Sequence, residues 1–138
     1  MSALVQAVAA PVIQPNPIPD AVGLLLTQLA DAINQQHWLS LAGLFEPDAL
    51  LVNLLGQRVS GDRAIVQYQQ GMAEFYPQRQ VHYRLLSCQP LGSALYLLNV
   101  QQLWLSAEHK QPEGVSSCPL FVVRLHGDHA RIVGCNSL

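Results

Sequence analysis

The sequence is poor in charged residues, which make up 12% of its 138 positions. Only seven residues are Lys or Arg, they are scattered along the chain, and the formal net charge is -2. A protein that follows a phosphate backbone needs a stripe or patch of basic side chains. The composition therefore argues against a nucleic-acid partner.

Long apolar runs are also missing. The densest of them, such as residues 95–100, fall far short of the roughly 20 residues that span a bilayer. The first ten residues contain no Lys or Arg, which a secretory signal places ahead of its apolar segment. We therefore expect a soluble protein with no membrane partner.

Cysteine is scarce, and its spacing fits neither a disulfide framework nor a zinc site. The three cysteines, Cys88, Cys118 and Cys135, are odd in number and lack both CxxC spacing and nearby paired histidines. His126 and His129 flank a turn with a single carboxylate, which is an incomplete metal site. The pattern predicts free, largely buried thiols in the cytoplasm, with no metal and no cofactor.

The chain is rich in apolar residues, which make up half of it. This content is enough for one domain to bury a hydrophobic core. Residues 11–19 hold four prolines in nine positions, which forbid a helix and favour an extended arm. The sequence therefore predicts an extended arm over residues 1–19 and one folded domain over residues 20–138.

Three helices are predicted in the first half of this domain. Asp20 can cap a helix that ends near Gln36, and its apolar residues recur at helical spacing at Val22, Leu26, Leu29 and Ile33. Residues 38–45 suit a short second helix that Glu46-Pro47-Asp48 stops. A third helix follows Ser60-Gly61-Asp62 and ends before Pro77.

The strands are predicted from apolar runs separated by Gly and Pro turns. Their ranges are 49–53, 57–59, 81–88, 94–105, 115–125 and 130–136. The element order is then α-α-β-β-α-β-β-β-β. Helices followed by hairpin-linked strands favour an α+β fold with an antiparallel sheet over a doubly wound parallel one.

The segment LFEPDALLVNLLGQRVSGDRAIVQY, residues 44–68, resembles the nuclear-transport-factor-2-like superfamily. The resemblance rests on a fixed order of features. These are a short helix ending in Leu44-Phe45, an acidic-Pro-Asp-Ala break, a strand, a Gly turn, and Gly61 ahead of Ala64-Ile65. It covers residues 20–138 and implies a cystatin-like cone, with three N-terminal helices packed on a curved, mostly antiparallel sheet around a cavity. Members include ketosteroid isomerases, SnoaL-type cyclases, limonene epoxide hydrolases, scytalone dehydratases and nuclear transport adaptors, so the fold does not select the activity.

The catalytic residues of ketosteroid isomerases are missing at the matching positions. Asn53 replaces the aspartate that moves the proton, Phe121 replaces the protonated acid, and Leu29 replaces the tyrosine. An amide cannot take a proton from carbon at neutral pH. The ketosteroid-isomerase chemistry is therefore not expected.

The other enzymes that share this fold fit little better. An epoxide hydrolase needs two aspartates bridged by an arginine, whereas Arg84 and Arg124 have no acidic neighbour in their strands. A scytalone dehydratase needs inward pairs of His and Asp, and His82 is the only histidine in the predicted strands. A lone strand histidine is more often structural than catalytic.

Four residues are predicted to line the pocket: Trp38 at a helix junction, and Asn53, Phe121 and Asn136 by their strand positions. Each also has a structural interpretation, because Trp38 can belong to the core and the two asparagines can satisfy buried backbone groups. Together they would form an apolar cavity with a few amide groups. Such a cavity suits the binding of a small apolar ligand.

The two longest predicted strands, 94–105 and 115–125, are apolar on both faces. A sheet covered by helices on one side and apolar on the other favours a homodimer through its outer face. The alternative is that the proline-rich arm folds back over this surface.

The sequence thus predicts a small-molecule-binding protein with an apolar pocket and no recognisable acid-base pair. One alternative is a SnoaL-like isomerase, cyclase or dehydratase that uses His82 or a water held by Asn53. Another is a protein adaptor that resembles nuclear transport factor, for which residues 87–90 and Gly56-Gln57 have faint counterparts.

Overall fold

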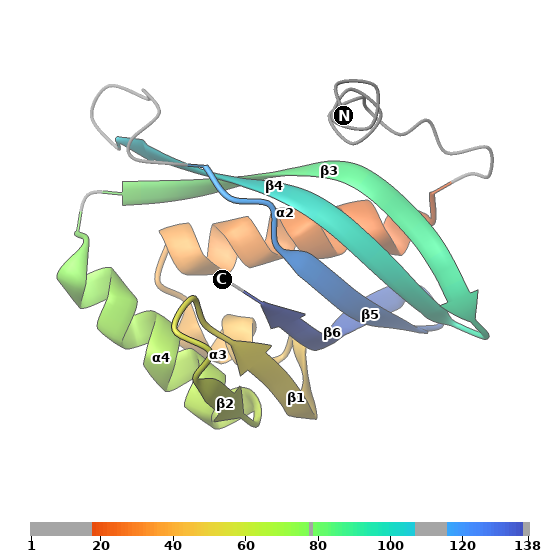
Figure 1. Ribbon diagram of the computed structural model, residues 1–138, viewed down its shortest axis with the longest axis horizontal. Helices are drawn as coiled ribbons and strands as arrows, with labels where there is room; N and C mark the ends of the chain where they lie inside the picture. The colour runs from red at the N-terminus through yellow and green to blue at the C-terminus, as the bar shows by residue number, and fades with distance from the viewer. Residues whose placement is uncertain (1–17, 78, 107–115, 137–138) are drawn as a thin grey trace, which may run out of the picture.

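A computed structural model describes residues 18–77, 79–106 and 116–136 (Figure 1). The predicted arm over residues 1–19 lies outside this part except for its last two residues. Three helices are described: α2 (Asp20–Asn34), α3 (Trp38–Ala42) and α4 (Asp62–Phe75). The strands are β1 (Phe45–Val52), β2 (Arg58–Ser60), β3 (Arg79–Gly92), β4 (Leu95–Ser106), β5 (Leu120–His126) and β6 (His129–Asn136). The predicted element order and the α+β class are confirmed.

The helix α2 buries one apolar stripe against the sheet. Its buried residues include all four that the periodicity selected, together with Leu25 and Ala32. The helix begins at Asp20, directly after Pro19, and ends where Gln36 turns the chain with a φ of 57°. The helix α4 likewise ends before Pro77, as predicted.

The strand boundaries differ most from the prediction at the start of β1, at the start of β5 and at the end of β3, which continues to Gly92 past the predicted end at Cys88. Strand β1 begins at Phe45 and not at Ala49, so Glu46-Pro47-Asp48 belongs to the strand and does not merely stop the helix. The register with β6 shifts between Phe45 and Leu50, and such an irregularity accommodates a proline that cannot donate to the ladder. Strand β5 begins at Leu120; among the described residues ahead of it, Ser117 forms an isolated bridge with Gln102 of β4, and the predicted start at residue 115 lies outside the described residues.

The six strands form one sheet in the order β2-β1-β6-β5-β4-β3. All neighbouring pairs are antiparallel except β1 and β6, which run parallel. The sheet curves, and α2 lies along its concave side while α4 runs beside β1 and β2 (Figure 1). The long strands β3 and β4 extend past the ends of the other strands (Figure 1). Among the described residues at that end of the molecule, β3 and β4 are the only named strands in the sheet.

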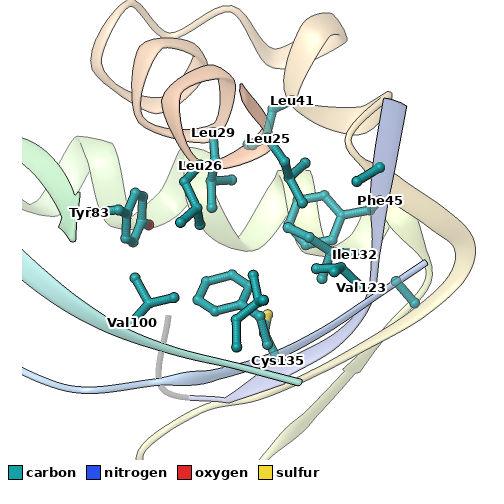
Figure 2. Packing of buried hydrophobic residues seen from close by; sticks show 14 of the residues in the cluster. Leu25, Leu26, Leu29, Leu41, Phe45, Tyr83, Val100, Val123, Ile132 and Cys135 are labelled. Atoms are coloured by element: carbon teal, nitrogen blue, oxygen red, sulfur yellow. The ribbon is translucent and has the colours of Figure 1, made fainter. Parts of the chain in front are cut away.

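The core fills the space between α2 and the middle of the sheet (Figure 2). Phe121 lies at its centre, fully buried, and its ring meets the Tyr83 ring edge to face with centroids 6.1 Å apart. Burial of each such side chain contributes roughly 1.5–3 kcal/mol relative to leaving it exposed. Side chains therefore fill the part of the cone that lies between α2 and the middle of the sheet.

Across the described ranges, no helix combines the length and the apolar character needed to cross a membrane.

Candidate functional site

A cavity of about 460 Å³ lies at the end of the molecule where β3 begins and β4 ends. Its walls come from the C-terminal end of α2, the inner face of α4, the loop between β1 and β2, and the sheet. The described lining residues are Ile33, Asn34, Gln36, Asn53, Leu54, Leu55, Tyr68, Gln69, Met72, Ala73, Tyr76, Pro77, Arg79, Gln102, Trp104 and Ser117. The set combines apolar and aromatic side chains with amides, which is typical of a small-molecule pocket.

One wall is fixed by the end of α2. The Asn34 side chain donates from Nδ2 to the Val81 carbonyl at 2.9 Å and accepts the Val81 N–H on Oδ1 at 2.7 Å. Val81 belongs to β3, which is an edge strand of the sheet. The amide thus satisfies two edge groups of the backbone and ties the helix end to the strand.

The opposite wall is a single face of α4. Ile65, Val66 and Gln69 are the buried residues of this helix, and Tyr68, Met72 and Ala73 follow on the side that lines the cavity. Residues three and four positions apart share a helix face, so Gln69 lies on the same face of α4 as the buried Ile65 and Val66. A glutamine four residues after buried Ile65 is the sequence signal that could have located this wall.

Asn53 shapes the loop at the cavity mouth. Its Oδ1 accepts hydrogen bonds from the backbone N–H of Leu55 at 3.0 Å and of Gln57 at 2.9 Å, and its Nδ2 donates to Gln57 Oε1 at 2.8 Å. This local bonding is typical of asparagine in turns. It presents Leu54 and Leu55, which are 84% and 82% exposed, at the mouth.

Two buried amides in the cavity wall each have one atom without a hydrogen-bond partner. Gln69 is 4% exposed and Gln102 is 3% exposed, yet Gln69 Nε2 and Gln102 Oε1 have no hydrogen bond. The other amide atom of Gln102, Nε2, donates to Ser117 Oγ at 3.3 Å. A buried polar group without a partner costs about 1–3 kcal/mol, so a molecule that paired with these groups would be stabilised.

Of the four predicted pocket residues, Asn53 lines this cavity. Trp38 borders a smaller adjacent hollow, which shares Gln36, Ala73 and Pro77 with the cavity. Phe121 is in the core, and Asn136 Oδ1 accepts the Leu120 N–H at 2.8 Å where the end of β6 lies beside the start of β5. The three predicted residues that do not line the cavity are thus held in place by packing or by a hydrogen bond to the backbone.

The described lining contains no carboxylate, imidazole or thiol. The two ketosteroid-isomerase positions filled by Leu29 and Phe121 are fully buried in the core. His82 is exposed on β3, and it alternates with the buried Val81 and Tyr83, so it points away from the cavity. Within the described residues, no group of three His, Cys, Asp or Glu could hold a metal ion.

Comparison with solved structures identifies the architecture. A domain of unknown function with a cystatin-like fold from Nostoc punctiforme matches with a TM-score of 0.73 and 19% identity, covering 84% of this chain and 73% of that one. The chain has the cystatin-like fold. The predicted nuclear-transport-factor-2-like resemblance is thereby confirmed at the level of fold.

Two further matches among the solved structures carry more descriptive names. A putative calcium/calmodulin-dependent protein kinase type II association domain from Thiobacillus denitrificans has a TM-score of 0.71 and 11% identity, covering 89% of this chain and 99% of that one. A Catenulispora acidiphila protein in complex with S-DNPA has a TM-score of 0.70 and 18% identity, covering 83% and 87%. No protein-family model and no curated protein matches the sequence.

Outside the cavity, the cystatin-like sheet carries a charged cluster on its outer face. Glu46 Oε1 lies 2.7 Å from His126 Nε2 and 3.3 Å from Arg124 Nη1. Burial acts to raise the pKa of Glu46, but the hydrogen bond and charge of His126 and the charge of Arg124 outweigh it and hold that pKa below its ordinary value. The cluster links β1 to β5 across the intervening β6.

Proposed function

We propose that the chain binds a small, largely apolar molecule in the cavity between α2, α4 and the long strands. The proposal is supported by an apolar and aromatic lining that includes two buried amides, each with one atom that has no hydrogen-bond partner. The exposed Leu54 and Leu55 at the mouth support entry of an apolar molecule. The Catenulispora acidiphila neighbour holds its ligand in the same fold, which agrees with this use of the architecture.

Binding is favoured over catalysis by the chemistry of the lining. General acid-base catalysis needs a group whose pKa lies near the operating pH, most often a histidine or a carboxylate. The described lining residues offer amides, two tyrosine hydroxyls, one serine and one arginine. These groups orient a ligand through hydrogen bonds and are not a proton-transfer pair.

The test is a fluorescence titration with N-phenyl-1-naphthylamine, a neutral dye that brightens in apolar sites. Ala73→Phe places a ring in the cavity, and Gln67→Phe places the same ring on an exposed position of the same helix as a control. Saturable binding to the native protein and to the control, with loss in Ala73→Phe, supports the proposal. Absence of saturable binding to the native protein, or equal binding to all three, contradicts it.

We also propose that two copies pair through the outer face of the sheet. The outward positions of β4 and β5 include six apolar residues that are only partly covered or exposed in the single chain: Leu95, Leu97, Leu103, Leu105, Leu120 and Val122. Asn99, Gln101, Arg124 and His126 share that face. An apolar patch of this kind on a sheet face favours a two-fold interface. Native mass spectrometry should give a dimer for the native chain and a monomer for Leu97→Lys, whereas a native monomer would contradict this pairing.

A cytoplasmic location fits the same proposal. Cys88 and Cys135 are buried free thiols, and the described cysteines form no disulfide. Unpaired buried thiols are typical of a reducing compartment. Localisation of a fluorescent fusion in its native cell checks this point, and export of the fusion would contradict it.

A further inference from the structure

Arg79 is the one charged residue among the described residues that line the cavity. It is the first residue of β3, directly after the segment that follows α4. Its guanidinium carbon lies 4.4 Å from the centre of the Tyr76 ring and 4.7 Å from the centre of the Trp104 ring. Two aromatic rings from opposite walls therefore hold the cation in place.

The rings position the guanidinium without neutralising it, because neither ring carries a formal charge. In the described part of the chain, the ion pairs involve Glu46 and Asp128, and no carboxylate lies within pairing distance of Arg79. Its Nε is buried and has no hydrogen-bond partner. A partly buried cation with an unused N–H favours an incoming anion, and a guanidinium matches the two oxygens of a carboxylate.

The two buried amides supply uncharged hydrogen-bonding groups that a ligand in the cavity can pair with. Gln69 Nε2 offers a free donor and Gln102 Oε1 a free acceptor, both from side chains more than nine-tenths buried. Ile33, Met72 and the Trp104 ring provide apolar surface in the same cavity. The lining thus presents one positive charge, two unpaired amide groups and an apolar wall.

We propose that the ligand is an amphipathic carboxylic acid, whose apolar body fills the cavity and whose carboxylate pairs with Arg79. This inference rests on the proposed binding function and specifies its ligand class. The pairing is a charge-assisted hydrogen bond, which contributes about 1.5–3 kcal/mol, or roughly 10-fold to 150-fold in affinity. A ligand with the same body but no charge should bind more weakly by that factor.

The experiment compares 2-naphthoate with 2-naphthalenemethanol, two probes that share a ring system and differ in charge. Isothermal titration calorimetry at pH 7 measures both against the native protein, Arg79→Gln, Arg79→Lys and the control Arg63→Gln. Arg63 is exposed on α4 and does not line the cavity. Thermal unfolding of each variant verifies that it is folded.

We expect the native protein and Arg63→Gln to bind naphthoate at least about 10-fold more tightly than the alcohol. Arg79→Gln should abolish this preference while binding the alcohol within about 3-fold of the native affinity, and Arg79→Lys should retain part of the preference because it keeps the charge. Equal affinity of the native protein for both probes overturns the carboxylate assignment and leaves the binding function standing. Failure of both probes and of the neutral dye overturns both.

Discussion

Asn34 pairs with Val81 as a strand residue would, donating to the carbonyl at 2.9 Å and accepting from the N–H at 2.7 Å. One side chain of α2 therefore completes the hydrogen bonding of an edge strand and fixes one wall of the cavity. A helix end and a strand start that are 47 positions apart in sequence become a single rigid unit.

Asn34→Leu should destabilise the protein, because it leaves both Val81 backbone groups without partners near the core. The expected loss is about 2 kcal/mol in the free energy of unfolding, measured by urea denaturation. Gln35→Ala, at the exposed next position, should change it by less than about 0.5 kcal/mol. Equal effects of the two substitutions would show that the Asn34 pairing contributes nothing.

Tyr83→Phe should leave stability unchanged or raise it by up to about 1 kcal/mol. The Tyr83 hydroxyl is buried without a hydrogen-bond partner, whereas its ring packs against Phe121. Phe121→Ala, which removes the other ring, should cost about 3–5 kcal/mol. Thermal unfolding of both variants checks the contrast, and a loss of more than about 1 kcal/mol in Tyr83→Phe would mean that the hydroxyl does have a partner.

The cluster of Glu46, Arg124 and His126 should stabilise the fold at neutral pH and lose this stabilising effect in acid. Because the pKa of Glu46 is lower in the folded chain than its ordinary value of 4.5, its contribution is present above that value and is lost as pH falls through the folded pKa. Arg124 and His126 are partly solvent-exposed, which limits the contribution at pH 7 to about 1 kcal/mol. Urea denaturation between pH 7 and pH 3 measures it.

In this series, Glu46→Gln should be less stable than the native protein at pH 7, and the difference should shrink below pH 4.5. Glu74→Gln, on the exposed side of α4, provides the matched control with an unchanged acid profile. A stability gap for Glu46→Gln that stays constant with pH would contradict the role of its carboxylate charge.

The three cysteines should differ sharply in reactivity. Cys118 is exposed, which corrects the expectation that all three thiols are largely buried. Burial raises the pKa of Cys88, and it raises the pKa of Cys135 to about 12. At pH 8, 5,5'-dithiobis(2-nitrobenzoate) should label about one thiol per native chain and three after unfolding.

Cys118→Ser should remove this fast reaction and leave the two slow thiols. Rapid labelling of a second thiol in the native protein would contradict the burial of Cys88 or Cys135.

The sequence predicted the order of elements because its apolar spacing reflects burial directly. Val22, Leu26, Leu29 and Ile33 repeat at helical intervals, and all four face the core. The start of β1 was missed because Pro47 normally breaks regular structure, and only the register shift against β6 makes room for it. Long-range pairing of this kind has no local signal.

The cavity was harder to predict than the fold. Asn53 was found through its place at the end of a strand, whereas Gln69, Arg79 and Gln102 were missed because amides and a lone arginine carry no recognisable motif. Their proximity depends on how far β3 and β4 extend beyond the neighbouring strands, which only the assembled sheet defines. Phe121 was assigned to the pocket by strand position, but side chains fill the cone at that depth.

The most direct test of cavity binding is a methyl NMR titration of the native protein with N-phenyl-1-naphthylamine. Binding in the cavity predicts saturable shifts for Ile33, Leu54, Leu55 and Met72, which line the cavity, and unchanged signals for Val123 and Ile132 in the core. Shifts confined to other residues, or no saturable shifts, would contradict it.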